Sequence, residues 1–266
     1  MTQLQIPADL QALIFDKDGT LIDFDAMWGA WITELARRLE AACAKLKIEN
    51  VKLRNGPTQY PDQFSILNSQ FSITERLFQV MGFDPASGRV AAGGRLAVTP
   101  MARLYAVTVD LVRDIGIPAA AAEQVVASAW YIPDPVALAR PLADLPALFG
   151  ALRARGIRIA VATSDDRTPT EMTLAGLGIA DLVSAVIGAD DGVPVKPAPD
   201  MVLTLCRDLG IAPARAAVVG DAVDDLEMGR AAAAGLVVGV LSGVSSAALL
   251  APHADVVIPS VAELIG

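Results

Sequence analysis

Hydrophobic and polar positions follow two different patterns along the chain. From residue 141 to the C-terminus, apolar runs of strand length alternate with segments whose apolar residues recur at helical spacing. The strands expected there are 157–162, 183–187, 216–219, 236–240 and 255–258, and the helices are 142–152, 168–177, 199–209 and one that ends near Gly235. A further apolar run at 12–15 is typical of a buried strand. Because strands that alternate with helices pair in parallel, we predict an α/β sheet covered on both faces.

The region between the first strand and Pro141 consists of helical patterns with hardly any β-branched runs. The expected helices are 25–47, 71–81, 101–115 and 119–130, with a loop over 90–97. Trp28 and Trp31 share one face of the first helix, which indicates a core rather than a substrate contact. Prolines at 133, 135 and 141 mark the far boundary. We therefore predict an α/β domain made of residues 1–23 and 140–266, with a helical domain, residues 24–139, inserted into it.

Composition limits the kinds of protein that this chain can be. Apolar residues make up 53% of it and charged residues 19%, as in globular proteins, and no run approaches the roughly 20 apolar residues of a membrane span. The N-terminus lacks the basic and apolar regions of an export signal. Cys43 and Cys206 have no metal-site spacing, so we expect reduced packing residues in a cytoplasmic protein. The net charge of −9 argues against a nucleic-acid partner.

Two acidic residues directly follow the first expected strand, in the run Asp16-Lys17-Asp18-Gly19-Thr20. Residues two apart on an extended chain point to the same side, so we expect Asp16 beside Asp18 and Lys17 facing away from them. Gly19 lets the chain leave the strand sharply. Two adjacent carboxylates repel unless a cation lies between them, and a hard dication such as Mg²⁺ meets that need.

Three more polar segments follow later strands. Thr163, followed by Ser164, ends the strand 157–162 and could donate to a phosphoryl oxygen together with the amides of the next turn. Lys196 lies among prolines that fix its backbone, which favours a held cation that binds phosphate as a point charge. Asp221 ends the strand 216–219, and Asp225 follows one helical turn later on the same side.

Each segment alone has an ordinary structural explanation. An Asp-Gly pair is commonly a plain turn, a Thr or Asp after a strand is commonly a helix N-cap, and a Lys-Pro pair is commonly exposed surface. The combination is far more specific, because all four segments come at or just behind strand ends. In an open parallel sheet, that edge is where ligands bind.

The ordered set resembles the haloacid dehalogenase superfamily of phosphatases, and in particular its phosphoglycolate phosphatase-like members. Their pattern is Asp-x-Asp-Gly-Thr, a Thr or Ser that ends a strand, a Lys, and then Gly-Asp-x-x-x-Asp. The resemblance covers about 150 residues and implies a Rossmann-like core of three layers. The insert then corresponds to an all-α cap in the family's first insertion position (C1 type).

The resemblance also implies roles for these residues. Asp16 would be the nucleophile that forms an aspartyl-phosphate, and Asp18 the acid and base that serves the leaving group and then water. The phosphate-binding residues would be Thr163, Ser164, Lys196 and Gly19. The Mg²⁺ ligands would be Asp16, the backbone carbonyl of Asp18, Asp221, and Asp225 either directly or through water. The substrate would be a small phosphorylated metabolite, such as phosphoglycolate or a sugar phosphate.

Several alternatives remain open from the sequence. A sugar phosphomutase of the β-phosphoglucomutase type has the same core and cap position. A receiver-like phospho-acceptor domain also combines acids, a hydroxyl and a lysine around Mg²⁺, although there the acidic pair precedes the phosphorylated Asp. A degenerate member that only binds ligand is disfavoured by intact Asp16, Asp18 and Lys196. The sequence does not indicate an oligomeric state.

Overall fold

The computed structural model describes residues 6–54 and 72–264. Residues 1–5, which we searched for an export signal, and residue 71, where we expected the second helix to begin, lie outside this part. The chain divides into two compact units, one formed by Met1–Met27 with Asp134–Gly266 and the other by Trp28–Pro133. In the described part, no helix has the length and apolar character needed to cross a membrane.

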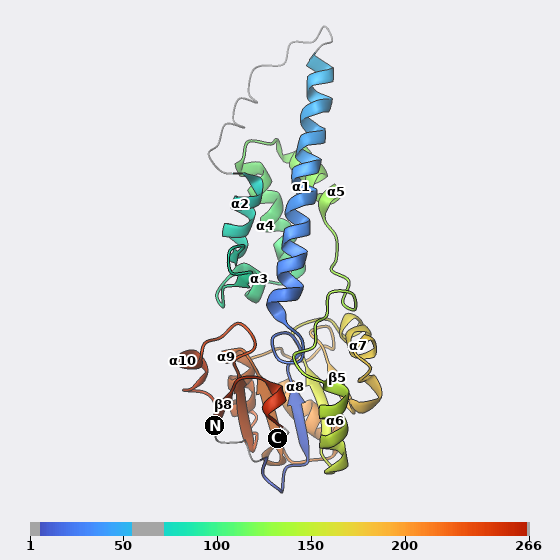
Figure 1. The fold of residues 1–266 in the computed structure, drawn as a ribbon, viewed down its shortest axis with the longest axis vertical. Coiled ribbons are helices and arrows are strands. Elements are labelled where there is room, and N and C mark those ends of the chain that lie inside the picture. The colour runs from blue at the N-terminus through green and yellow to red at the C-terminus, as the bar shows by residue number, and fades with distance from the viewer. Residues whose placement is uncertain (1–5, 55–71, 265–266) are drawn as a thin grey trace. The chain divides into compact units, whose positions relative to one another are not determined.

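The first unit contains a six-stranded parallel sheet with the order β5-β4-β1-β6-β7-β8 (Figure 1). Its strands are β1 (Ala12–Phe15), β4 (Arg158–Ala162), β5 (Ala185–Ile187), β6 (Ala216–Gly220), β7 (Leu236–Val240) and β8 (Val256–Ile258). The chain adds strands on one side of β1 and then, from β6 onward, on the other. The order therefore reverses between β1 and β6, and ligands bind at such a reversal in open parallel sheets. The predicted α/β class is confirmed.

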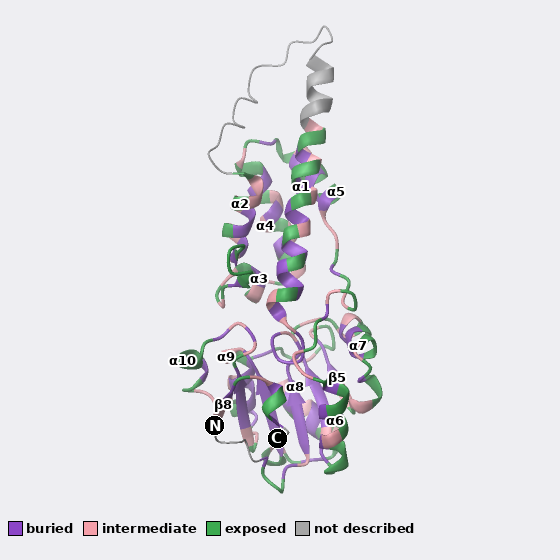
Figure 2. Ribbon diagram, in the orientation of Figure 1, coloured by how far each residue is buried: buried purple, intermediate pink, exposed green. Residues whose placement is uncertain are grey.

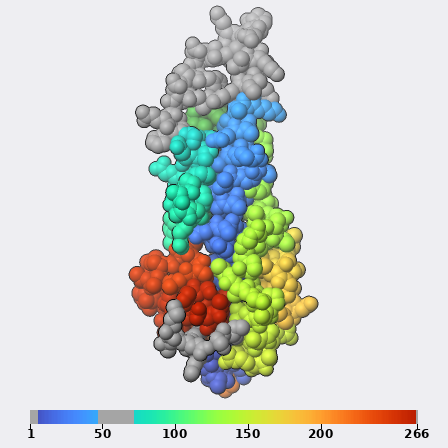
Figure 3. All heavy atoms as spheres, in the orientation of Figure 1, coloured from blue at the N-terminus to red at the C-terminus, as the bar shows by residue number. Residues whose placement is uncertain are grey.

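Helices cover both faces of this sheet, as the alternation of its apolar side chains requires. The connecting helices are α6 (Leu145–Ala154), α7 (Arg167–Gly176), α8 (Asp200–Leu209), α9 (Val223–Ala231) and α10 (Ala247–Leu250). Leu13 and Phe15 belong to one core cluster with Phe149 of α6, while Ile14 belongs to another with Leu205 of α8. Figure 2 shows the four central strands as almost wholly buried. Figure 3 shows that segments far apart in the sequence contribute to the surface of this unit. They are the C-terminal segment (red) and the segment that contains α6 (yellow-green).

The register of the sheet brings separate strand ends to one edge. Phe15 of β1 is opposite Val161 of β4 and Val219 of β6. Because all three strands run in the same direction, the residues that follow them emerge side by side. The acidic and hydroxyl segments predicted from the sequence are therefore attached to neighbouring positions.

The second unit is mainly helical. Most of α1 (Phe24–Arg54) lies in it, together with α2 (Ile73–Met81), α3 (Arg95–Val98), α4 (Met101–Asp114) and α5 (Ala119–Ala129), and with a hairpin of β2 (Phe83–Asp84) and β3 (Arg89–Val90). Trp31 is fully buried, with its ring against Trp28 and Trp130. The expected face of the first helix is therefore a core face.

Two predictions for the helical region were wrong in detail. The insert is not wholly helical, because β2 and β3 form an antiparallel pair, and the expected loop 90–97 includes the start of α3. Two-residue strands and a four-residue helix are too short to show a hydrophobic period. Cys43 of α1 and Cys206 of α8 are both buried, as expected of packing residues.

Candidate active site

Asp16 directly follows β1, and its amide donates to the carbonyl of Val219 at 2.9 Å, which continues the pairing with β6 by one residue. The chain then folds into a turn closed by the amides of Leu21 and Ile22, which donate to the carbonyl of Lys17 at 2.8 and 3.1 Å. Gly19 lies in this turn with φ +86°, a conformation that glycine adopts at little cost. The turn thus fixes the direction in which the acidic residues leave the strand.

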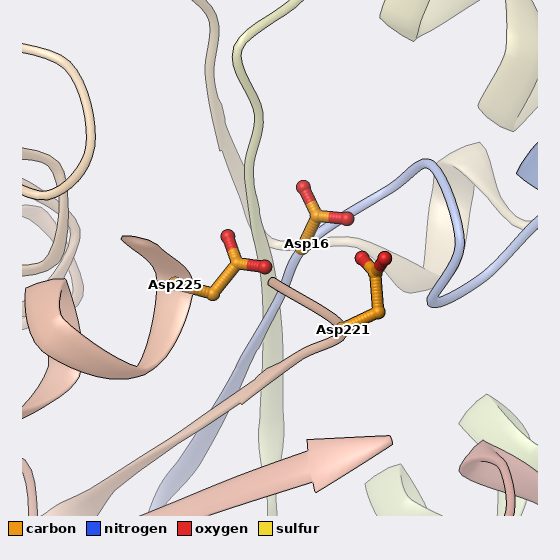
Figure 4. Close-up of side chains that lie close together, drawn as sticks. All are labelled: Asp16, Asp221 and Asp225. Carbon is orange, nitrogen blue, oxygen red and sulfur yellow. The ribbon is translucent and has the colours of Figure 1, made fainter. Parts of the chain in front are cut away.

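Asp221 and Asp225 come from the loop after β6 and the first turn of α9. An Asp221 oxygen accepts from the amide of Val244 at 2.8 Å, and an Asp225 oxygen accepts from the amide of Ala222 at 3.0 Å. Both side chains point toward Asp16 (Figure 4). One carboxylate oxygen from each of the three residues lies within 4.8 Å of the others, and all three residues are buried.

Lys196 brings a positive charge to this group. Its Nζ atom lies 2.5 Å from Oδ1 of Asp16 and 2.6 Å from Oδ1 of Asp225, and the residue is 9% exposed. Burial alone would lower the pKa of Lys196, but the Asp16 and Asp225 carboxylates raise it above its ordinary value. The lysine therefore stays charged between two acids.

One ammonium does not balance three buried carboxylates. Burial, partly opposed by Lys196 and reinforced by Asp225, raises the pKa of Asp16 to about 6. Burial, together with the nearby Asp16 and Asp225, holds the pKa of Asp221 well above its ordinary value. Both groups resist ionisation because too little positive charge is close to them.

A hard divalent cation fits this arrangement. Three converging carboxylates offer the oxygen ligands that Mg²⁺ prefers, and the raised pKa values of Asp16 and Asp221 indicate charge that a cation would compensate. Room for the acids depends on glycine, since a Cβ atom at Gly243 would lie 2.0 Å from Oδ2 of Asp221. The sequence offered no signal for Gly243, because its loop after β7 meets the site only in the fold.

Asp18 lies outside this group of three carboxylates. Its Oδ2 atom is 2.6 Å from Nζ of Lys17, which also lies 2.9 Å from Oδ2 of Asp165. The expectation that Lys17 faces away was wrong, because the chain is no longer extended after Asp16. Alternation of side chains applies only to an extended strand.

The surroundings of Asp18 make its neutral and ionised forms comparably stable near neutral pH. Burial, opposed by Lys17 and reinforced by Asp165 and Asp16, raises the pKa of Asp18 to about 7. For Lys17, burial acts to lower the pKa, yet Asp18 and Asp165 raise it above its ordinary value. A carboxyl with a pKa near 7 is suited to giving up and taking back a proton.

The remaining predicted residues lie at or near the same edge. Thr163 is buried, and its hydroxyl accepts from the amide of Asp165 at 3.2 Å, so it does not cap α7, which begins at Arg167. Ser164 is exposed. The amide of Gly19 donates to the carbonyl of Ile22 at 2.7 Å, within its own turn.

Two groups at this edge were missed by the sequence reasoning. They are Lys17, which is 1% exposed, and Asp165, to which it is paired. The residue type of Lys17 was the available signal, because a lysine directly after a buried strand needs a partner. Arg167, the first residue of α7, is paired with Asp191 at 2.7 Å.

Comparison with known proteins agrees with this geometry. A family model described as haloacid dehalogenase-like hydrolase matches residues 10–233. A phosphoglycolate phosphatase of Rhodospirillum rubrum is 40% identical over 110 residues, which is 41% of this chain and 46% of the relative. The matched segment thus spans less than half of that relative. A phosphoglycolate phosphatase of Aquifex aeolicus is matched over 48% of its length.

Solved structures share the whole fold at low sequence identity. A HAD-superfamily hydrolase from Geobacter sulfurreducens has a TM-score of 0.61 at 18% identity, over 96% of this chain and 95% of that one. A HAD family hydrolase from Deinococcus radiodurans, solved with bound phosphate and sodium, has a TM-score of 0.59 at 19% identity, over 97% and 94%. These two structures support the fold assignment.

Proposed function

The chain belongs to the haloacid dehalogenase-like hydrolases, and from this premise we propose that it is a Mg²⁺-dependent phosphatase. The observation that carries the proposal is the convergence of Asp16, Asp221, Asp225 and Lys196 at the carboxyl edge of the sheet. Asp16 and Asp221 flank the point where the strand order reverses. Buried acids with one buried lysine form a site for a cation and an anion together.

In the proposed reaction, an oxygen of Asp16 attacks phosphorus and forms an aspartyl-phosphate, while the bond from phosphorus to the leaving oxygen breaks. Asp18 gives its proton to that oxygen. Asp18 then takes a proton from water, whose oxygen attacks the phosphorus, releases inorganic phosphate and restores the Asp16 carboxylate. The pKa of Asp18, raised to about 7, supports both tasks.

Lys196 and Thr163 are proposed to bind the phosphoryl group, assisted by Ser164 and Gly19. Lys196 already lies at the nucleophile, so its charge is in place before the phosphoryl group arrives. Asp16, the carbonyl of Asp18, and Asp221 would hold Mg²⁺, with Asp225 bound directly or through water. When bound, the ion supplies positive charge to the phosphoryl oxygens and lowers the repulsion between nucleophile and substrate.

We propose a small phosphorylated metabolite of the phosphoglycolate or sugar phosphate type as the substrate. Support comes from the Rhodospirillum rubrum relative, which is a phosphoglycolate phosphatase. Cys43 and Cys206 are buried in separate units, as packing residues are, and we propose that the protein acts in the reducing cytoplasm.

A screen of phosphorylated metabolites, with Mg²⁺ and with a chelator, tests the proposal. The matched variants are Asp16→Asn and Asp224→Asn, since Asp224 is an exposed acid near the site. We expect phosphate release that needs Mg²⁺, is lost in Asp16→Asn and persists in Asp224→Asn. Hydrolysis without metal, or full activity of Asp16→Asn, would overturn the mechanism. Interconversion of glucose 1-phosphate and glucose 6-phosphate with little phosphate release would instead identify a mutase.

A further inference from the structure

Lys17 is a buried ammonium that the proposed reaction does not use. It is 1% exposed and contacts two carboxylates, Asp18 at 2.6 Å and Asp165 at 2.9 Å. Burying a charge is unfavourable, and apolar side chains of similar volume often replace buried ion pairs without loss of stability. Packing at position 17 therefore does not require a lysine. We infer that the positive charge and the hydrogen-bond donors of Lys17 have a function of their own.

The two partners of Lys17 are fixed by different parts of the sheet edge. Asp18 belongs to the turn after β1, where three amides donate to the carbonyl of Lys17. Asp165 follows β4, with its amide bonded to the Thr163 hydroxyl and its carbonyl to the amide of Ala189 at 2.8 Å. Since β1 and β4 are neighbours in the sheet, Lys17 links two adjacent strand ends.

The two oxygens of Asp18 have different surroundings. Oδ2 accepts from Lys17, whereas Oδ1 is buried and has no hydrogen-bond partner among the residues that the structure describes. An ammonium group has only hydrogen-bond donors and no acceptor, so Lys17 cannot accept a hydrogen bond from a proton on Oδ2. A proton on Asp18 is therefore directed to Oδ1.

We propose that Lys17, held by Asp165, is a positioning residue that makes Oδ1 of Asp18 the oxygen that delivers and recovers the proton. This inference rests on the proposed function, in which Asp18 is the acid and base. In the first step, the bond from Oδ1 to hydrogen breaks and the leaving oxygen gains that hydrogen. In the second step, Oδ1 takes a proton from the attacking water.

The test compares kcat/KM for 2-phosphoglycolate, whose leaving alkoxide needs a proton, and for p-nitrophenyl phosphate, whose leaving anion is stable without one. The ratio of these two kcat/KM values depends only on the steps up to the release of the leaving group. For Lys17→Met we expect kcat/KM for 2-phosphoglycolate, the alkyl ester, to fall about 10²-fold. For p-nitrophenyl phosphate, the aryl ester, the fall in kcat/KM should be at least tenfold smaller. Asp165→Asn should shift the ratio in the same direction by a smaller factor.

Three controls keep the outcomes separate. Lys45→Met changes an exposed lysine, and Asp166→Asn changes the exposed acid next to Asp165, so neither should alter the ratio. Asp18→Asn should show the same preference for the aryl ester as Lys17→Met, only larger. If Asp18→Asn lacks this preference, the proposed acid role fails.

Other results would overturn the inference alone. If Asp18→Asn shows the preference and Lys17→Met loses both activities equally or neither, Lys17 has no positioning role. Should Lys17→Met fail to fold, Asp165→Asn decides, because the Asp165 side chain is 34% exposed and asparagine matches it in size. An unchanged ratio in Asp165→Asn would then overturn the inference.

Discussion

Nζ of Lys196 lies 2.5 Å from Oδ1 of Asp16, although the two residues are 180 positions apart in the chain. The same ammonium lies 2.6 Å from Asp225. One lysine therefore joins the residue after the first strand to the first turn of α9. Its removal would leave two buried acids facing each other without a cation.

Lys196→Met should reduce kcat/KM for the best phosphate ester by about 10²- to 10³-fold, the usual effect of removing one electrostatic donor from an active site. It should also lower the free energy of unfolding of the metal-free protein by about 3 kcal/mol, because the remaining charges are uncompensated. Steady-state kinetics and urea unfolding measure these effects. Lys45→Met, which changes an exposed lysine of α1, serves as the control. A loss of activity below about fivefold would contradict the prediction.

Asp225→Asn should weaken Mg²⁺ binding by at least about tenfold, because it removes one of three converging carboxylates whether that group binds the ion directly or through water. Asp224→Asn should leave the affinity unchanged, since Asp224 is exposed. Isothermal titration of Mg²⁺ into each variant provides the comparison. Equal effects of the two substitutions would mean that Asp225 has no special part in the site.

Much of this arrangement could be predicted from the sequence because it depends on strand ends. The apolar runs located β1, β4 and β6, and parallel pairing then required that Asp16, Thr163 and Asp221 emerge at one edge. Spacing placed Asp225 on the same side as Asp221, and both belong to the acidic group.

Other features could not be predicted because they depend on irregular backbone. The contact between Lys17 and Asp18 arises in a turn, where strand alternation no longer holds. Asp165 meets Lys17 only through the register of β1 with β4. Gly243 approaches Asp221 from a loop with no local motif, so only the folded chain reveals its role.

Gly243→Ala should impair the site without changing any charged residue. The added Cβ atom would lie 2.0 Å from Oδ2 of Asp221, so that carboxylate or its loop must move. We expect Mg²⁺ affinity and kcat/KM to fall at least about tenfold, as geometric displacement of a site commonly does. Gly150→Ala is the control, because its methyl group meets open space on α6 and should stabilise the protein by about 0.5–1 kcal/mol. Normal Mg²⁺ binding by Gly243→Ala would contradict the steric argument.

Stabilisation by Mg²⁺ should depend on pH in a defined direction. The pKa of Asp16 is raised to about 6, so without metal the folded protein holds this proton more tightly than the unfolded chain does. Ionisation of Asp16 therefore destabilises the metal-free fold above about pH 6, and the penalty disappears as the pH falls toward about 4, the ordinary carboxyl value. Asp221, whose pKa is also raised, acts in the same direction.

Mg²⁺ has the opposite preference, because it binds the ionised carboxylates and must displace protons at low pH. The rise in Tm caused by a fixed Mg²⁺ concentration should therefore be larger at about pH 8 than at about pH 5.5, following the apparent affinity. Thermal unfolding with Mg²⁺ or with a chelator at both pH values measures the difference. In Asp16→Asn the dependence on pH should be weaker, since the variant lacks one of the titrating acids. An equal Tm shift at both pH values in the wild type would show that the acids at this edge do not bind the ion.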